Sequence, residues 1–485
     1  MFPPIVLLFF TLSLSTLIFA ETIDYKNLKT PAGDKLPNFS FAGYHQSEIP
    51  LPALTTPANK TLSPGSGDQA PVIQAALDSV KDSGGGVVEL KAGTYALSSG
   101  LLIHSQTTLR GAGIGKTVLT VKNLEDNVVT LGKQTNGAKR GDSVKITDTY
   151  VPAGTSTVHV SDASRFKVGQ EVFIERGVTQ MWIDEMGMTP HTKWLPPGTL
   201  VPQPRLIASI SGKAISFTIP LTDSLNATNS IMTPIQLTPY VPPTQPSEIG
   251  IENLSMRVSP SCSGIALGNT TCSASAVRVS SWTSDSWVRN LDLTGFNNHI
   301  TTGQYSARIT ITNITMNRNG ATDNSAGYAL DIAIDGTQTL IHNCKTLGAK
   351  DAKSFGVATQ SLTPGPNACI GYEAQQAVES VEPHQRWAHG FLNEGSKVAA
   401  VLLRNRGAAG SGHGWTVNNA VSYNTNASAY TIQNPPLGQN YCIGCVGPKD
   451  SKQVNNGTFL SYGKFVDPPS LFEAQLKDRG FDFKI

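Results

Sequence analysis

A short asparagine-centred motif recurs between residues 249 and 447, and it constrains the fold more than any other feature of the chain. In each instance an apolar residue and one further residue precede the asparagine, and a roughly alternating triplet follows it. Asn290 and Asn313 lie 23 residues apart and Asn313 and Asn343 lie 30 apart, which is the spacing of solenoid repeats. One repeat of this length cannot bury its own apolar face, so successive repeats must stack. The instances centre on Asn253, Asn290, Asn313, Asn343 and, more weakly, Asn405.

This repeat predicts an all-β fold, a right-handed parallel β-helix (solenoid). The turns of such a helix favour an interior asparagine whose amide bonds its equivalents in adjacent coils, so the asparagines are interpreted as scaffold and not as catalysts. The composition agrees with a globular chain, because 39% of its residues are hydrophobic and 15% are charged, with a net charge of +2. That balance excludes a disordered chain and a polycationic binder, and no nucleic-acid partner is expected.

The N-terminal residues 1–20 predict a signal peptide with cleavage after Ala20. The apolar run is short for a membrane span, and no second apolar stretch approaches membrane length, although an uncleaved anchor is the alternative. We therefore expect a secreted, extracellular monomer with no membrane partner. Eight N-x-Ser/Thr acceptors agree with secretion, at Asn38, Asn59, Asn226, Asn253, Asn269, Asn313, Asn426 and Asn456. If Asn313 lies in the asparagine ladder, it cannot carry a glycan.

Six cysteines form an even set that an oxidising compartment would allow to pair. Cys442 and Cys445 form a single C-x-x-C, which is a weak zinc signal and in a secreted chain favours a disulfide or buried thiols. The other four are Cys262, Cys272, Cys344 and Cys369.

The chain divides into a signal peptide (1–20), an N-terminal arm (21–67), first coils (68–140), an inserted small β domain (141–240), a main β-helix (241–450) and a C-terminal tail (451–485). An N-terminal capping helix is expected from Asp68, as N-cap, to Val80, with an apolar face of Val72, Ile73, Ala76, Leu77 and Val80. In the insert, the loop from Met181 to Pro197 carries Trp182 and Trp194. These two rings suit stacking on sugars, and the alternative is that they are core of the insert.

Loops from successive coils of a solenoid line an elongated groove, which suits a polymer. The richest stretches for chemistry are Glu382 to Gly390 and Ser411 to Trp415. His384 and His413 are 29 residues apart, about one coil plus a loop, so the two stretches are expected to share one wall. Candidate substrate-binding residues there are Glu382, Gln385, Trp387 and Trp415.

Two segments of the sequence are similar to a known group of proteins. Residues 67 to 113, with the capping helix, three glycines and "AGTY", resemble the N-terminal coils of the pectate lyase superfamily. The blocks "EPHQRW", "GSGHGW" and "QNPPLGQNYCIGCVG" look like a secreted subgroup of that superfamily. The resemblance implies a carbohydrate-active enzyme that acts on an extracellular polysaccharide, most often a polysaccharide lyase or a hydrolase. Fold alone does not decide between them.

A lyase that removes the C5 proton of a uronic acid needs a base, a partner for the carboxylate and a donor for the leaving oxygen. We predict His384 as the base, Arg386 as a carboxylate clamp and His413 as the proton donor, with Glu382 orienting a histidine. The alternative is a structural cluster in which Arg386 pairs with Glu382. A pI near 8.1 is compatible with an anionic substrate.

A hydrolase needs two carboxyl groups about 5 to 10 Å apart. Of the polygalacturonase-type motif set, only Gly412-His413-Gly414 is present. Alternative catalytic carboxylates are Asp331, Asp335 and Glu382, with Glu394 as a further partner, although both aspartates could instead be surface turn residues. Calcium is undecided, with Asp184, Glu185, Asp331 and Asp335 as candidate ligands. A non-catalytic carbohydrate-binding β-helix would not need His384, Arg386 and His413 together.

Overall fold

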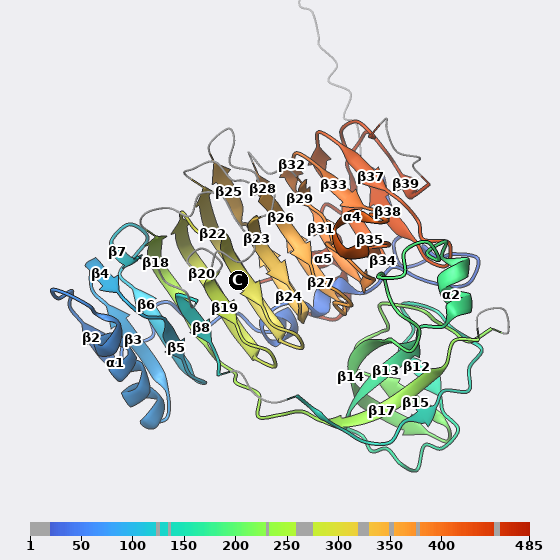
Figure 1. Cartoon of the computed structure of the whole chain (residues 1–485), viewed down its shortest axis with the longest axis horizontal. Coiled ribbons are helices and arrows are strands. Elements are labelled where there is room, and N and C mark those ends of the chain that lie inside the picture. The colour runs from blue at the N-terminus through green and yellow to red at the C-terminus, as the bar shows by residue number, and fades with distance from the viewer. Residues whose placement is uncertain are drawn as a thin grey trace, which may run out of the picture.

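The computed structural model describes residues 20–122, 127–133, 137–228, 232–258, 275–318, 329–348, 354–374, 379–450 and 456–485. Its main body is a parallel β-helix whose three sheets run side by side along the solenoid (Figure 1). The fold class expected from the asparagine repeat is confirmed. The predicted signal peptide, Cys262, Cys272 and Asn269 lie outside the described residues. Within the described part of the chain, no helix is long and apolar enough to cross a membrane.

The first sheet has nine parallel strands, which follow one another along the solenoid in chain order. They are β5 (Leu101–Ile103), β8 (Val129–Leu131), β19 (Ser275–Val279), β21 (Asn298–Thr302), β23 (Ala329–Ile334), β26 (Ser354–Thr359), β29 (Glu379–Val381), β33 (Val401–Leu403) and β37 (Tyr430–Ile432).

The second and third sheets meet at a corner, where three long strands pass from one sheet into the other: β18 (Gly250–Val258), β20 (Ser284–Thr294) and β22 (Ala307–Arg318). Other strands of the second sheet are β2 (Lys60–Leu62), β3 (Gly86–Leu90), β6 (Thr107–Gly111), β24 (Thr337–His342), β27 (Asn367–Ile370), β31 (Phe391–Glu394), β35 (Ala420–Tyr423), β38 (Asn440–Ile443) and β39 (Thr458–Leu460). Those of the third are β4 (Gly93–Leu97), β7 (Thr117–Val121), β25 (Lys345–Gly348), β28 (Glu373–Ala374), β32 (Lys397–Val398) and β36 (Asn426–Ala427).

The predicted asparagine ladder forms this corner. Asn290 Nδ2 donates to Asn253 Oδ1 at 2.9 Å, Asn313 Nδ2 to Asn290 Oδ1 at 3.2 Å, and Asn343 Nδ2 to Asn313 Oδ1 at 2.6 Å. All four have left-handed backbone, with φ between 50° and 59°, a conformation that asparagine tolerates better than most residues. In the next two coils Gly371 and Gly395 take the same corner with φ of 66° and 62°.

Two expectations about the asparagines are corrected. The ladder faces outward and not into the interior, since Asn313 and Asn343 are exposed, because a left-handed residue at a corner points its side chain away from the core. Asn405 lies at a different edge, where its Oδ1 accepts from the Gly407 N–H. Asn313 lies in the ladder and donates to Asn290 through the amide nitrogen to which a glycan would be attached, so an unmodified Asn313 remains the prediction.

Helix α1 (Ala70–Asp82) covers the open end of the first coils, where Ile73, Leu77 and Val80 join the main core. The N-cap is Gln69 and not Asp68 as expected, although the Asp68 carboxylate accepts from the Ala70 N–H at 3.1 Å and from the backbone N–H and hydroxyl of Ser98. Val72 is about half exposed, at 51%, so its assignment to the buried face is wrong, because it lies at the edge of the stripe that Ile73, Leu77 and Val80 form around the helix.

The insert replaces the connection between β8 and β18, and its strands are antiparallel around a separate core. In Figure 1 it lies beside the coils near the C-terminal end. Its elements are β9 (Lys139–Arg140), β10 (Val144–Lys145), β11 (Tyr150–Val151), β12 (Thr157–His159), β13 (Glu171–Gly177), α2 (Gln180–Glu185), β14 (Leu200–Ser211), β15 (Ala214–Phe217), β16 (Leu225–Asn226) and β17 (Ile235–Val241).

The two terminal segments pack together on the outside of the second sheet. Leu36 and Phe39, the latter in η1 (Phe39–Phe41), share a core with Leu471 and Leu476 of α5 (Leu471–Asp478). Strand β1 (Glu21–Thr22) pairs with β40 (Val466–Asp467), and η2 (Tyr44–Ser47) follows η1. The segment expected to be a C-terminal tail therefore belongs to the fold, because its apolar residues cover an otherwise bare sheet face.

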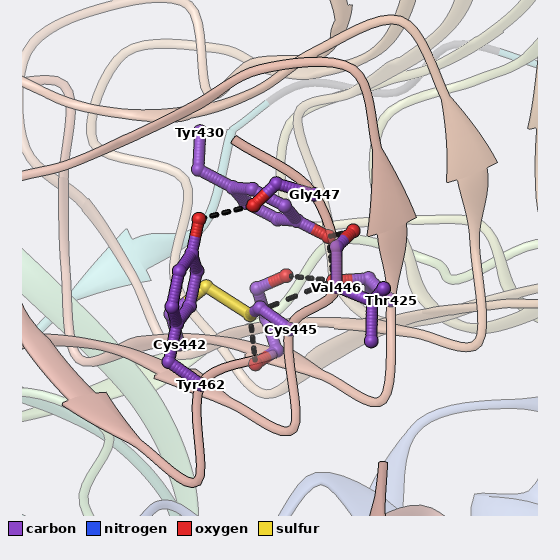
Figure 2. Close-up of a disulfide and its surroundings, with 8 residues drawn as sticks. Thr425, Tyr430, Cys442, Cys445, Val446, Gly447 and Tyr462 are labelled. Carbon is purple, nitrogen blue, oxygen red and sulfur yellow. Dashed lines mark hydrogen bonds between the residues drawn. A yellow bond between two sulfur atoms is a disulfide. The ribbon is translucent and has the colours of Figure 1, made fainter. Parts of the chain in front are cut away.

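Cys442 and Cys445 form a disulfide at the C-terminal end of the solenoid (Figure 2). Around it, the Thr425 hydroxyl contacts Cys445 Sγ, and the Tyr462 hydroxyl donates to the Gly447 carbonyl. Cys344 and Cys369 are free thiols buried in the main core.

Candidate active site

The candidate catalytic residues His384, Arg386 and His413 lie along one edge of the solenoid. It consists of the loops that lead from the first sheet to the second: residues 280–283, 303–306, 335–336, 360–366, 382–390 and 404–419, together with the insert, which is itself an enlarged loop of this kind. We call it the loop edge. Loops of neighbouring coils are bonded to each other, since the Leu362 N–H donates to the Arg386 carbonyl and the Arg386 N–H to the His413 carbonyl.

The structure brings His384, Arg386 and His413 together on the loop edge. The rings of His384 and His413 meet edge to face, with centroids 4.6 Å apart. His384 is half-buried, and its backbone N–H donates to the Thr359 carbonyl in the preceding coil at 2.9 Å. We call these three residues the His–Arg cluster.

His413 follows the short helix α4 (Ala409–Gly412) and is buried, with 8% exposure. Its Nδ1 is fully buried and has no hydrogen-bond partner among the described residues, so Nε2 is the nitrogen left to meet a substrate. Nε2 lies against Gly410, whose φ is 57°, and a Cβ at Gly410 would come within 2.2 Å of it. Burial, and then the charges of Arg406 and Arg386, lower the pKa of His413 to about 4.

Arg386 is fixed by four hydrogen bonds. Its Nε donates to the Lys193 carbonyl of the insert at 3.2 Å, Nη2 donates to the carbonyl and hydroxyl of Ser411, and Nη1 donates to the Gln385 side chain. These bonds occupy most of the five N–H donors of the guanidinium. The expected two-pronged clamp on a carboxylate is therefore corrected to a fixed positive charge with one N–H to spare.

Glu382 does not lie on a surface that a substrate could reach, as expected for a binding residue, because it is completely buried. Its Oε1 accepts from Arg404 Nε at 2.7 Å and lies 3.5 Å from Arg406 Nε. The alternative pairing of Glu382 with Arg386 is also wrong. Arg404 and Arg406 were missed in the sequence, although "RNRG" stands directly between the two histidine motifs. With Arg386, three guanidinium groups lie along this part of the edge, and the four bonds of Arg386 go to neutral groups that leave its positive charge in excess.

The four candidate tryptophans form one buried cluster between the insert and the coils. Trp182 and Trp194 stack at 5.0 Å, and both meet Trp387 edge to face. Trp415 Nε1 donates to the Met186 carbonyl at 3.0 Å. Their exposure is between 1% and 7%, so stacking on a sugar is corrected to fastening the insert onto the loop edge, because apolar rings on both surfaces are buried when the surfaces meet.

The alternative carboxylates do not converge on a substrate site. Asp331 is completely buried, and both Arg318 Nη2 at 2.6 Å and the Thr346 hydroxyl at 2.9 Å donate to it. Burial alone would raise its pKa, but the charge of Arg318 and the bond from His299 lower it to about 2. Asp331 is therefore a core residue and not a surface turn residue. Glu394 is buried as well and accepts from the N–H groups of Leu471 and Phe472 at the start of α5.

Asp335 lies on the loop edge and is half-buried, and burial raises its pKa to about 6 against the opposing charge of Arg278. The candidate calcium ligand Asp184 instead accepts from Gln180 and Thr189. Among the described residues, no three His, Cys, Asp or Glu side chains come together as a metal site. The calcium expectation therefore gains no support from these carboxylates.

No family model matches the chain. It is 35% identical over 86 residues to alginate lyase 7 of Azotobacter vinelandii, which covers 16% of this chain and 10% of that protein. Among solved structures, it is similar to the tailspike protein gp49 of Pseudomonas phage LKA1, with a TM-score of 0.44, 12% identity and coverage of 77% of this chain and 56% of that one. It is also similar to the A-module of mannuronan C-5 epimerase AlgE4 of Azotobacter vinelandii, with a TM-score of 0.36, 10% identity and coverage of 83% and 94%. The chain thus spans a tenth of the curated relative and just over half of the tailspike.

Proposed function

We propose that this protein is a secreted carbohydrate-active enzyme that cleaves an acidic polysaccharide by β-elimination at the His–Arg cluster. The observation that carries the proposal is the contact of two imidazole rings within an excess of fixed positive charge. A uronic-acid carboxylate is attracted to such a position, and the neighbouring rings supply groups that can move protons. The stretch shared with a protein named as an alginate lyase supports lyase chemistry.

His413 is proposed as the base. With a pKa near 4 the ring is neutral at pH 7, so one ring nitrogen has a lone pair that can accept a proton, and the imidazolium form that would act as an acid is scarce. The roles expected from the sequence are therefore exchanged between the two histidines, because burial beside Arg386 and Arg406 keeps His413 uncharged. A bound carboxylate offsets these charges and raises the basicity of His413 when the substrate is in place.

The proposed reaction is a single elimination step. His413 takes the proton from C5 of the uronic acid, and the electron pair of that C–H bond forms a C4–C5 double bond. The C4–O bond breaks, and its electron pair stays on the leaving oxygen, which is protonated by His384. Arg386 stabilises the negative charge that builds up next to C5 in the transition state.

The test is product analysis on a panel of uronic-acid polysaccharides and neutral glucans. Each digestion is followed by ultraviolet absorbance and by reducing ends. Elimination leaves an unsaturated sugar that absorbs in the ultraviolet, so both signals rise together. Reducing ends without absorbance would show hydrolysis and remove the histidines from their proposed roles. The same secreted protein, sequenced from its N-terminus, tests cleavage after Ala20.

A further inference from the structure

A recess opens on the loop edge, between the insert and the coils that precede the His–Arg cluster. It has a volume of about 560 Å³ and is lined by residues of the insert, the solenoid and η2. A smaller cavity of about 280 Å³ shares Trp282 and Tyr305 with it. We call the larger recess the cleft. Its size is in the range of small-molecule and sugar sites.

The floor of the cleft consists of residues with unusual backbone. Asp285, Arg308 and Gln338 lie in successive coils and have φ of 43°, 58° and 53°. At the asparagine ladder, the same left-handed conformation is taken by asparagine and glycine, which tolerate it best. Here the positions carry a carboxylate, a guanidinium and an amide, and all three residues line the cleft, where Gln338 Nε2 donates to the Phe41 carbonyl. Such departures concentrate where side-chain chemistry is needed.

The wall provided by the insert contains a carboxyl group with one oxygen that lacks a partner among the described residues. Glu171 lies on β13, and its Oε2 is fully buried with no hydrogen-bond partner among the described residues. The Tyr240 side chain bonds the same carboxyl group. Burial raises the pKa of Glu171, so its protonated carboxylic acid form persists to higher pH. An unpaired buried polar oxygen is unfavourable, and a ligand hydroxyl would satisfy it.

The charged groups that line the cleft are satisfied within the protein: Glu48 pairs with Arg479, and the buried Arg205 donates to the backbone carbonyls of Ile219 and Pro220. Arg308 holds Asp285 through two bonds of 2.6 and 2.8 Å. His45 of η2 bonds Glu248 at 2.7 Å. The cleft therefore offers hydrogen-bonding groups without a strong net charge, and the rings of Tyr240, Trp282 and Tyr305 supply apolar surface.

We propose that the cleft binds an uncharged sugar unit of a glycan, with Glu171, Tyr240 and Gln338 bonding its hydroxyls and Tyr305 contacting its apolar face. The cleft and the His–Arg cluster lie on the same edge. Tyr305 follows β21 and His384 follows β29, three strand steps further in the first sheet, or about 14 Å at about 4.8 Å per step. On the proposed function, one polymer therefore places an acidic unit at the cluster and a neutral unit in the cleft.

The direct test is a titration of the full-length protein with neutral hexasaccharides of glucose, mannose, galactose and xylose, followed by calorimetry. These probes have no uronic acid, so elimination cannot consume them. Thr218→Trp fills the cleft from an exposed position of the insert, and we expect the affinity of the best probe to fall at least about tenfold. Tyr305→Ala should weaken binding by up to about tenfold, through loss of the ring contact. Ser161→Trp, exposed and away from the cleft, is the matched control.

The outcomes separate this inference from the proposed function. If neutral probes bind and Thr218→Trp abolishes binding while the protein shows no elimination, the cleft stands and the proposed function fails. If no neutral probe binds, or if the binding is equal in Thr218→Trp and Ser161→Trp, the inference is overturned. If the cleft binds a uronic-acid hexasaccharide more tightly than the neutral probes, the proposal that it binds an uncharged sugar is overturned. If the enzyme is active, two KM values are compared: one for a polymer of mixed neutral and acidic units, and one for a uronic-acid homopolymer. Thr218→Trp should raise the first about tenfold relative to the second.

Discussion

The His–Arg cluster and the cleft lie on the same edge of the solenoid but differ in how their charges are arranged. At the cluster, the carboxylate of Glu382 is sealed beneath the surface and shared by Arg404 and Arg406, so positive charge dominates above it. In the cleft, Asp285 and Arg308 neutralise each other at the surface. The cluster draws its ionisable groups from the coils, whereas the cleft adds groups from the insert and the N-terminal arm. The comparison teaches that neighbouring coils can give one edge two different charges, because an ion pair between adjacent coils cancels in the cleft while Arg386 at the cluster has no acidic partner among its bonds.

The largest expected effect is the loss of a proton-transfer group at the cluster. His413→Ala and His384→Ala should each reduce elimination by a factor of about 10² to 10⁴ while the protein stays folded. His159→Ala, on the surface of the insert beside Asp148, is the control and should retain full activity. Rates from the rise in ultraviolet absorbance measure the effect, and circular dichroism checks the fold. Full activity in His413→Ala would remove the cluster from the reaction.

The next effect concerns the buried carboxylate beneath the cluster. Glu382→Gln leaves Arg404 and Arg406 without their counter-charge in a buried site, so the free energy of unfolding should fall by about 3 to 5 kcal/mol. Asp285→Asn should cost less, about 1 kcal/mol, because the Asp285–Arg308 pair is partly exposed. Glu373→Gln, whose pair with Lys397 is exposed, is the control. Urea unfolding measures all three, and equal losses in Glu382→Gln and Glu373→Gln would contradict the assignment.

A smaller effect is expected from a single methyl group next to His413. In Gly410→Ala the new Cβ would collide with Nε2, and the positive φ at this position disfavours alanine. A displaced base loses about 10²-fold in rate. Gly463→Ala, also at positive φ but in open space, separates backbone strain from the collision. The rate loss should be confined to Gly410→Ala, and an equal loss in both variants would point to strain alone.

The smallest effect is a shift of the pH profile. A base must be neutral, so activity should persist above the pKa of His413 and fall as the pH drops through about 4. Arg386→Gln removes one of the positive charges that lower this pKa, so the acid limb should move to higher pH. Arg165→Gln, whose partner Asp142 is exposed, should leave the limb in place. An unchanged acid limb in Arg386→Gln would show that another group controls it.

Much of the fold could be predicted because the repeat is local. The spacing of Asn290, Asn313 and Asn343 sets the coil length, and their amides bond only to equivalents one coil away. The sequence could not show that the ladder faces outward, because the left-handed backbone that turns the side chains away is visible only in the coordinates. Val72 was misplaced for a similar reason, since the face of a short helix depends on where the first coil meets it.

The candidate site was predictable only in part. "EPHQRW" and "GSGHGW" lie one coil apart, so the contact between His384 and His413 follows from the stacking of coils. The role of each ring does not follow, because the pKa of His413 depends on burial and on Arg386 and Arg406. The tryptophans Trp182 and Trp387 illustrate the same limit, since their types suit both a sugar and a core.

The sequence by itself determined the solenoid, the place of the insert in the chain and the segments that carry the two histidines, because these depend on spacing along the chain. Only the tertiary structure decided which charges are buried, which rings remain open and where the cleft lies. Glu171 and Asp285 are far apart in the sequence, and they share a cavity only because the insert folds back along the edge from which it emerges. Electrostatics and burial depend on neighbours in space, and those neighbours come from segments whose contacts no local pattern encodes.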